Sequence, residues 1–156
     1  MVEHFSHDMK KLPKFSLPAS NGHTYTNADF ASGTFVLYVY PKDMTPGCTI
    51  EAHDFVGMLP KFNELGVSIF GLSKDSLKSH NFFCSLIGLD FPLLSDEEHT
   101  LLSALDCWKE QSMFGKKYWG TERSTFVIRD GKIIKLWRKV KVPGHVAAVL
   151  DFVENN

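Results

Sequence analysis

One stretch of the chain is continuously apolar, a second is mostly apolar, and helical periodicity lies between them. Residues 35–40 and 67–72 have the composition of strands that are covered on both faces, as in a parallel sheet. Between them, apolar residues recur at intervals of three and four, which predicts an amphipathic helix that ends near Gly66. The predicted buried stripe of this helix is Phe55, Met58, Leu59 and Phe62.

Shorter elements complete the pattern on either side. The turn signal Asn21-Gly22 predicts a small hairpin between residues 14–17 and 23–25. Further helices are expected over 73–87, where Leu77, Cys84 and Ile87 share one side and Gly88 follows, and over 97–105, with a short strand between the two. A second hairpin, formed by 125–128 and 132–137, precedes a final helix whose stripe is Val146, Val149, Leu150 and Val153.

This order of elements predicts the fold class. Strands that alternate with helices, followed by an antiparallel pair, favour an α/β protein with a mixed central sheet flanked by helices and an N-terminal hairpin. A thioredoxin-like arrangement satisfies the pattern. No low-complexity linker, charge block or repeat divides the 156 residues, so a single domain over residues 1–156 is expected.

Charge and cysteine content exclude several classes of protein. Seventeen basic and eighteen acidic residues give a net charge of −1, which argues against a nucleic-acid or membrane partner. The longest apolar run, 35–40, is too short to span a bilayer, and residues 1–8 lack the apolar segment of a secretory signal. Three cysteines are too few for a secreted disulfide framework, so a cytoplasmic protein with a catalytic cysteine is expected.

The segment between the first buried strand and the following helix carries the candidate chemistry. Pro41 ends the strand because it has no N–H to donate, and Cys48 falls at the start of the helix. The positive end of a helix stabilises an anion, so Cys48 should lose its proton more readily than a free thiol. The sequence therefore predicts a nucleophilic cysteine.

A peroxide is one substrate that such a cysteine can attack. A thiolate alone does not make that reaction fast, because the nucleophilicity of sulfur falls as its basicity falls. Donors are also needed to stabilise the negative charge on the leaving oxygen of a peroxide. We expect these donors to be the N–H groups around Gly47 and Cys48, the Thr45 hydroxyl and a guanidinium. Gly47 would let a ligand approach the backbone, and Pro46 would shield the sulfur from water.

These residues resemble a known family. Pro41, Thr45 and Cys48 match the Pro-x-x-x-Thr-x-x-Cys signature of the peroxiredoxins, and the surrounding residues 40–52 resemble the PrxQ, or bacterioferritin comigratory protein, subgroup. Residues 91–96 and 115–126 resemble the same subgroup, so the similarity extends over nearly the whole chain.

The resemblance implies a thiol peroxidase that needs no cofactor or metal and is a monomer. Cys48 would be oxidised to a sulfenic acid by hydrogen peroxide or an organic hydroperoxide, with Thr45 and Arg123 as catalytic residues. Substrate binding would involve Pro41, Thr45, Gly47 and Arg123. Thioredoxin or a similar dithiol protein would reduce the resulting disulfide. Glu51 also matches the subgroup, but an ordinary acid in the first turn of a helix explains it equally well.

The resolving cysteine departs from the commonest subgroup pattern, in which it follows the nucleophile by five residues. That position is His53 here, which leaves Cys84 and Cys107. Another branch of the subgroup carries the resolving cysteine on the next helix, where Cys84 falls, and we favour Cys84. Two helical cysteines are unlikely to start within disulfide reach, so oxidation should require local unwinding. Cys107 is expected to be structural.

Other functions fit the sequence less well. A dithiol oxidoreductase needs Cys-x-x-Cys, and Glu51 occupies the second position. The histidines and cysteines lack the Cys-x-x-Cys and His-x-x-x-His spacings of metal ligands, so a metal site is not expected. A one-cysteine peroxidase, or a redox sensor without an internal resolving cysteine, stays open as the alternative.

Overall fold

The computed structural model describes residues 2–3 and 10–156, so most of the segment tested for a secretory signal lies outside the described residues. The strands are β1 (Val2–Glu3), β2 (Ser16–Pro18), β3 (Thr24–Thr26), β4 (Thr34–Val39), β5 (Val67–Ser73), β6 (Leu93–Ser95), β7 (Trp108–Met113), β8 (Lys116–Thr121), β9 (Ser124–Arg129) and β10 (Lys132–Trp137). The helices are η1 (Asn27–Phe30), α1 (Pro46–Glu64), α2 (Leu77–Ile87), α3 (Thr100–Ala104) and α4 (His145–Asn155). Among the described residues, no helix is long and apolar enough to cross a membrane.

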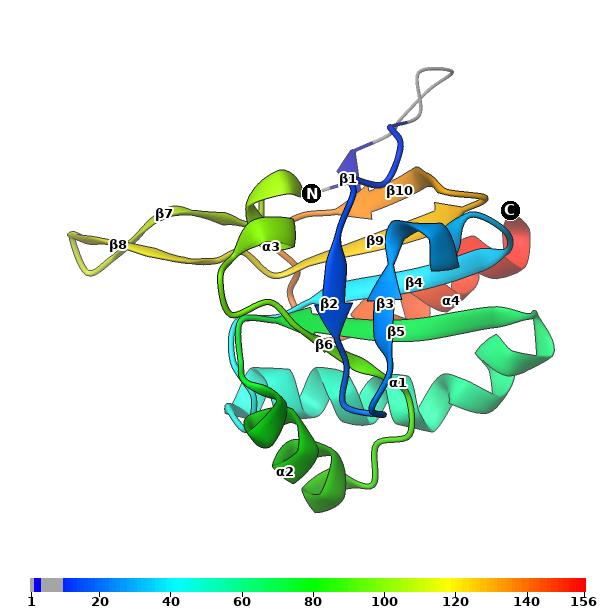
Figure 1. Ribbon diagram of the computed structural model, residues 1–156, viewed down its shortest axis with the longest axis horizontal. Coiled ribbons are helices and arrows are strands. Elements are labelled where there is room, and N and C mark those ends of the chain that lie inside the picture. Colours follow the sequence, from blue (N-terminus) through cyan, green and yellow to red (C-terminus); the bar gives the residue numbers. More distant parts are fainter. Residues whose placement is uncertain (1, 4–9) are drawn as a thin grey trace.

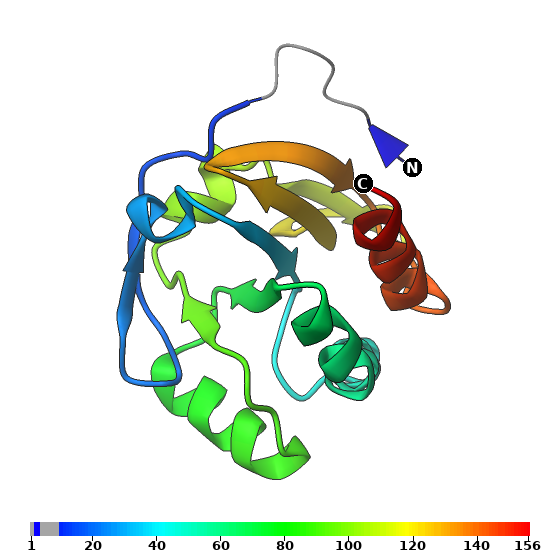
Figure 2. The same ribbon diagram turned by 90° about the vertical axis from the view of Figure 1, so that its right-hand side faces the viewer.

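A mixed six-stranded sheet lies at the centre, in the order β1-β10-β9-β4-β5-β6 (Figure 1). Strand β4 pairs in parallel with β5 and antiparallel with β9. Helices α1 and α4 cover one face of the sheet, while the β2–β3 hairpin, η1 and α3 cover the other (Figure 2). The predicted mixed sheet, flanking helices and N-terminal hairpin are therefore confirmed.

The two-sided cover explains why β4 is continuously apolar. Val36 and Tyr38 belong to the core beneath α1 and α4, whereas Leu37 and Val39 belong to the core on the opposite face. Side chains of a strand alternate between its faces, so a strand covered on both faces has no polar side. This strand leads directly to the segment that contains Cys48.

Helix α2 lies beside the β6 edge of the sheet and is shorter than predicted (Figure 2). Ser73, the predicted first residue, belongs to β5, and the helix begins after Ser76, whose hydroxyl accepts a hydrogen bond from the Ser79 N–H. The predicted end at Gly88 is correct. The fully buried residues of α2 are His80 and Phe83, and Cys84 is only half-buried beside them.

The sequence analysis missed the β7–β8 hairpin, an arm that projects from the body of the molecule (Figure 1). Most of its side chains are at least partly exposed, with Phe114 at the turn 98% exposed. A hairpin without a buried face has no reason to alternate polar and apolar residues, so its sequence carries little strand periodicity. The missed arm leads directly to Arg123.

Two glycines, one in strand β5 and one in helix α1, test how tightly the protein is packed around them. A Cβ atom at Gly71 would lie 2.5 Å from Cδ2 of Leu93 and 3.2 Å from the ring of Tyr38, so Gly71→Ala should overpack the core and lower the free energy of unfolding by about 1–3 kcal/mol. Gly57, inside α1, has open space at that position, so Gly57→Ala should raise it by about 0.5–1 kcal/mol. Urea denaturation of the reduced proteins measures both. A Gly71→Ala protein as stable as the parent would contradict the close packing of β5 against Tyr38.

Candidate active site

Cys48 lies where the sequence places it, in the first turn of α1. The N–H of Tyr40 still bonds to the carbonyl of Leu72 beyond the end of β4, and the chain then leaves the sheet at Pro41. Thr45 is the N-cap of α1, so Cys48 is the third helical residue. The cysteine is only 2% exposed.

The backbone around Cys48 offers hydrogen-bond donors. The N–H of Thr49 bonds to the carbonyl of Thr45 at 2.9 Å, which closes the first helical turn. The N–H groups of Gly47 and Cys48 precede this bond, and such groups at the start of a helix have no partner within it. These N–H groups and the positive end of the helix dipole favour negative charge at this point.

Arg123 approaches Cys48 from across the sheet. It immediately precedes β9, and β9 pairs with β4. Its Nη2 donates to the Cys48 sulfur at 3.4 Å, and its Nη1 donates to Oε1 of Glu51 at 2.7 Å. A Cβ atom at Gly47 would lie 3.2 Å from Nη2, so the glycine leaves room for the guanidinium. The structure therefore brings Cys48, Gly47 and Arg123 together.

Glu51 is more than an ordinary acid of the first turn, because its side chain is fully buried against Arg123. Burial raises the pKa of the Glu51 carboxyl to about 7, even though the Arg123 guanidinium acts in the opposite direction. Burial lowers the pKa of Arg123, but the nearby Glu51 and Cys48 outweigh this effect and raise it, so the guanidinium stays charged. Glu51 thus orients a partly buried cation that faces the sulfur.

Thr45 and Pro41 belong to the loop that precedes α1. The Thr45 hydroxyl donates its proton to the carbonyl of Lys42 at 2.7 Å, which leaves the oxygen free to accept a hydrogen bond. The carbonyl of Pro41 accepts a hydrogen bond from the side-chain amine of Lys74 at 2.9 Å, which fixes the loop to the residues after β5. The expected donor role of the Thr45 hydroxyl is therefore corrected: its proton is engaged with Lys42, and its oxygen can instead accept a hydrogen bond from a ligand.

The other two cysteines lie in different environments. Cys84 is half-buried on α2, and this burial raises the pKa of its thiol. Cys107 is fully buried between α3 and β7, which likewise raises its pKa, and its sulfur contacts the Leu105 carbonyl at 3.7 Å. All three cysteines are free thiols. Cys84 is therefore the more accessible of these two thiols, while Cys107 is enclosed in the core.

His145 completes the surroundings of Arg123. Burial, reinforced by the nearby positive charge of Arg123, lowers the pKa of His145 to about 4, so its ring is neutral at neutral pH. Its Nε2 lies 2.8 Å from the Thr125 hydroxyl. The guanidinium thus faces one ionisable acid, one thiol and one neutral ring.

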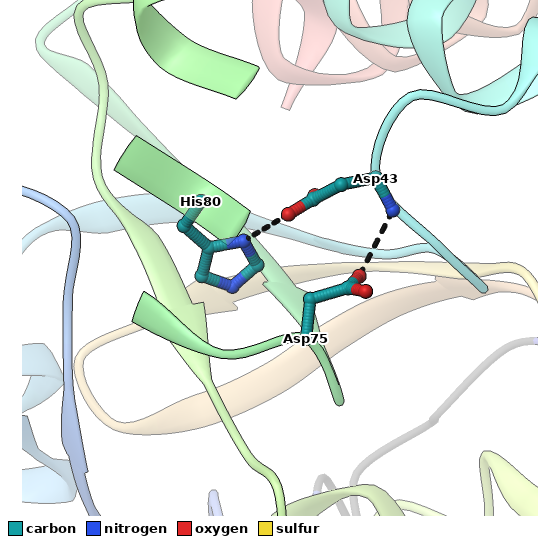
Figure 3. Close-up of side chains that lie close together, drawn as sticks. All are labelled: Asp43, Asp75 and His80. Atoms are coloured by element: carbon teal, nitrogen blue, oxygen red, sulfur yellow. Dashed lines mark hydrogen bonds and ion pairs between the residues drawn. The ribbon is translucent and has the colours of Figure 1, made fainter. Parts of the chain in front are cut away.

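A second buried cluster escaped the sequence analysis. Asp43, in the loop before Cys48, meets His80 and Asp75 in a group close to the start of α2 (Figure 3). The residues come from three separate segments, and only the position of His80 three residues after Leu77 hinted that it faces the core. No spacing in the sequence connects them.

Comparisons with known proteins address the family of this chain. The AhpC/TSA family model matches residues 9–136. Peroxiredoxin Bcp of Xanthomonas campestris pv. campestris is 49% identical over 139 residues, which cover 87% of each chain. Peroxiredoxin Bcp of Bacillus subtilis is 47% identical over 147 residues, which cover 94% of each chain.

Solved structures give the same result. Peroxiredoxin Q of Xanthomonas campestris superposes with a TM-score of 0.87 at 45% identity and covers 91% of this chain and 90% of its own. Bacterioferritin comigratory protein of the same organism, solved in trapped intermediate and ligand complexes that address its alkyl peroxide reduction activity, superposes with a TM-score of 0.86 at 44% identity over 90% of each chain.

The buried carboxyl of Glu51 should make stability depend on pH. Its pKa is about 7 in the folded protein against 4.5 for an ordinary glutamate, so the folded state holds a proton that the unfolded state releases between these values. The free energy of unfolding should therefore fall by about 2–3 kcal/mol as the pH rises from 4.5 to above 7, and Glu51→Gln should remove this dependence.

Urea denaturation at pH 5 and pH 8 measures the effect, with Cys48→Ser as the background so that the nucleophilic thiol does not contribute. The titration of His145 is common to both proteins and cancels in their difference. Glu64→Gln, at the exposed end of the same helix, is the control and should leave the pH dependence unchanged. If stability depends on pH equally in the Glu51→Gln protein and its parent, burial does not raise the pKa of the Glu51 carboxyl.

Proposed function

This chain belongs to the AhpC/TSA family, in its PrxQ or bacterioferritin comigratory protein subgroup, and from that premise we propose that Cys48 reduces hydrogen peroxide and organic hydroperoxides. Its thioredoxin-like fold and its thiol-dependent peroxidase activity follow from the same membership. One observation carries the assignment of Cys48. Its sulfur lies in the first turn of α1, 3.4 Å from a guanidinium that Glu51 orients.

The first half-reaction is an attack of the Cys48 thiolate on the terminal oxygen of the hydroperoxide ROOH. A sulfur–oxygen bond forms while the oxygen–oxygen bond breaks, so the sulfur becomes a sulfenic acid and RO⁻ leaves, taking up a proton to give ROH. Arg123 and the N–H groups of Gly47 and Cys48 stabilise the charge that develops on the oxygens. Because these donors are already fixed around the sulfur, little reorganisation is needed during the reaction.

The substrate would lie between the helix terminus and the loop. We assign substrate binding to Pro41, Thr45, Gly47 and Arg123. The Thr45 oxygen accepts the hydrogen bond of the peroxide, since its own proton is engaged with Lys42. Pro41 fixes the loop that leads to Cys48, because its carbonyl is held by the side-chain amine of Lys74. The alkyl peroxide reduction activity of the Xanthomonas campestris relative supports organic hydroperoxides as substrates.

The second half-reaction recycles the enzyme. The Cys84 thiol attacks the sulfenic sulfur, a disulfide forms, and the sulfenic oxygen leaves as water. Burial raises the pKa of Cys84, so its thiol stays protonated until it meets the sulfenic acid. Thioredoxin, or a similar dithiol protein, then reduces the disulfide and is itself oxidised to a disulfide. A monomeric state, a cytoplasmic location and a single domain over residues 1–156 complete the proposal.

Replacing each cysteine separates this mechanism from a one-cysteine peroxidase. Peroxide consumption is followed with thioredoxin, thioredoxin reductase and NADPH. Cys48→Ser should abolish consumption, because serine cannot form a sulfenic acid, whereas Cys84→Ser should consume one equivalent of peroxide and then stop. Cys107→Ala should sustain turnover, because Cys107 is enclosed in the core.

Peptide mapping after one equivalent of peroxide identifies the partner of Cys48 independently. We expect a disulfide between Cys48 and Cys84. Sustained turnover of Cys84→Ser would establish the one-cysteine mechanism instead. A disulfide between Cys48 and Cys107 would show that Cys107, and not Cys84, is the resolving cysteine.

A further inference from the structure

A buried carboxylate connects the loop before Cys48 to the start of α2. Asp43 is 2% exposed, and its Oδ1 accepts a hydrogen bond from the Tyr40 hydroxyl at 2.6 Å. Its Oδ2 accepts from the Ser79 hydroxyl at 2.8 Å and lies 2.7 Å from Nδ1 of His80 (Figure 3). Two of these three partners belong to the first turn of α2. A single side chain therefore ties the loop to the helix that carries Cys84.

His80 is suited to hold this carboxylate because both of its ring nitrogens face acceptors. Its side chain is fully buried, and Nε2 lies 2.9 Å from the carbonyl of Leu94. A carbonyl can only accept, so Nε2 must carry a proton, and a second proton is shared between Nδ1 and Asp43. The pair is then neutral overall, which allows its complete burial.

A second set of bonds fixes the backbone of the same loop. The N–H of Asp43 bonds to Oδ2 of Asp75 at 2.9 Å (Figure 3). The same oxygen also accepts a hydrogen bond from the Ser73 hydroxyl at 2.6 Å. Asp43, Asp75 and His80 lie as close together as metal ligands would. Their facing atoms are instead occupied by protons from neighbouring groups, so they form a hydrogen-bond network.

This network holds the loop before Cys48 and the helix that carries Cys84 in the arrangement in which both cysteines are free thiols. Cys48 lies in the first turn of α1 and Cys84 lies in the middle of α2. A disulfide requires the two Cα atoms to approach to about 5.5–6 Å in a specific geometry, and we expect from the sequence that local unwinding is needed to reach it. The bonds of Asp43 to the first turn of α2 oppose that unwinding.

We propose that Asp43, Ser79 and His80 are positioning residues that control the passage from the first half-reaction to the second. While Asp43 holds α2, the loop keeps the donors around Cys48 in place for attack on peroxide. When Asp43 and α2 separate, Cys84 becomes able to reach the sulfenic acid. This inference rests on the proposed resolving role of Cys84.

The hydrogen bonds between Asp43 and α2, called the tie below, also determine which product the sulfenic acid forms. While α2 is held, the sulfenate of Cys48 can attack a second hydroperoxide, which oxidises the sulfur to a sulfinic acid and releases a second ROH. Once α2 is released, the sulfenic acid condenses with the Cys84 thiol and water leaves. A weaker tie should therefore speed disulfide formation and reduce overoxidation, without changing the groups that contact the peroxide.

Two serines of α2 provide a matched test. Ser79→Ala removes one donor to Asp43, whereas Ser85→Ala changes an exposed serine of the same helix. After one equivalent of hydrogen peroxide, quenched samples give the rate of disulfide formation by mass spectrometry. Loss of one hydrogen bond to a carboxylate should speed this step about three- to ten-fold in Ser79→Ala and leave it unchanged in Ser85→Ala. The sulfinic fraction at excess peroxide should fall in parallel.

Hydrogen exchange on the reduced proteins reports the tie without relying on Cys84. Amides in the first turns of α2 should exchange faster in Ser79→Ala, and faster still in Asp43→Asn, than in Ser85→Ala. The rate of the first peroxide attack should change less than the rate of disulfide formation, which a general loss of stability would not produce.

Suppose that the wild-type protein forms the Cys48–Cys84 disulfide. The inference is then overturned if the disulfide forms at the same rate or more slowly in Ser79→Ala. Unchanged exchange in α2 would overturn it as well. Absence of that disulfide from the wild type would instead refute the proposed role of Cys84, so the two failures are distinguishable.

Discussion

The site depends on a charged, partly buried guanidinium held beside a buried sulfur. Arg123 is fixed by Glu51 on one side and contacts Cys48 on the other. The arrangement works because the antiparallel pairing of β9 with β4 brings Arg123 to the same end of the sheet as the start of α1. In such a low-dielectric setting, a fixed donor stabilises developing charge far more than water would.

This arrangement carries an energetic conflict. Glu51 must be ionised to form a full ion pair with Arg123, yet its burial favours the protonated form and brings its pKa to about 7. The free energy needed to remove two ions from water is often as large as the free energy gained when they form a buried ion pair. The position of Glu51 is therefore better understood as serving the orientation of Arg123 than the stability of the fold.

Much of the fold and part of the site could be predicted from the sequence, for identifiable reasons. Strand β4 was predictable because both of its faces are covered, and Cys48 because a strand, a proline and an amphipathic helix frame it. Burial of Glu51 was not predictable, because its opposing charge comes from a residue 72 positions away. The tie between Asp43 and His80 joins residues 37 positions apart, and only the packing of α2 against the sheet edge brings them together.

The enclosure of Cys107 has a consequence for the redox chemistry of the whole chain. The sequence has three thiols, and all are free in the folded protein, but Cys107 is completely covered and lies away from the donors that surround Cys48. Mispaired disulfides thus become a property of the unfolded polypeptide, in which all three sulfurs compete on equal terms. Folding before the first encounter with peroxide therefore prevents disulfides between the wrong pairs of cysteines.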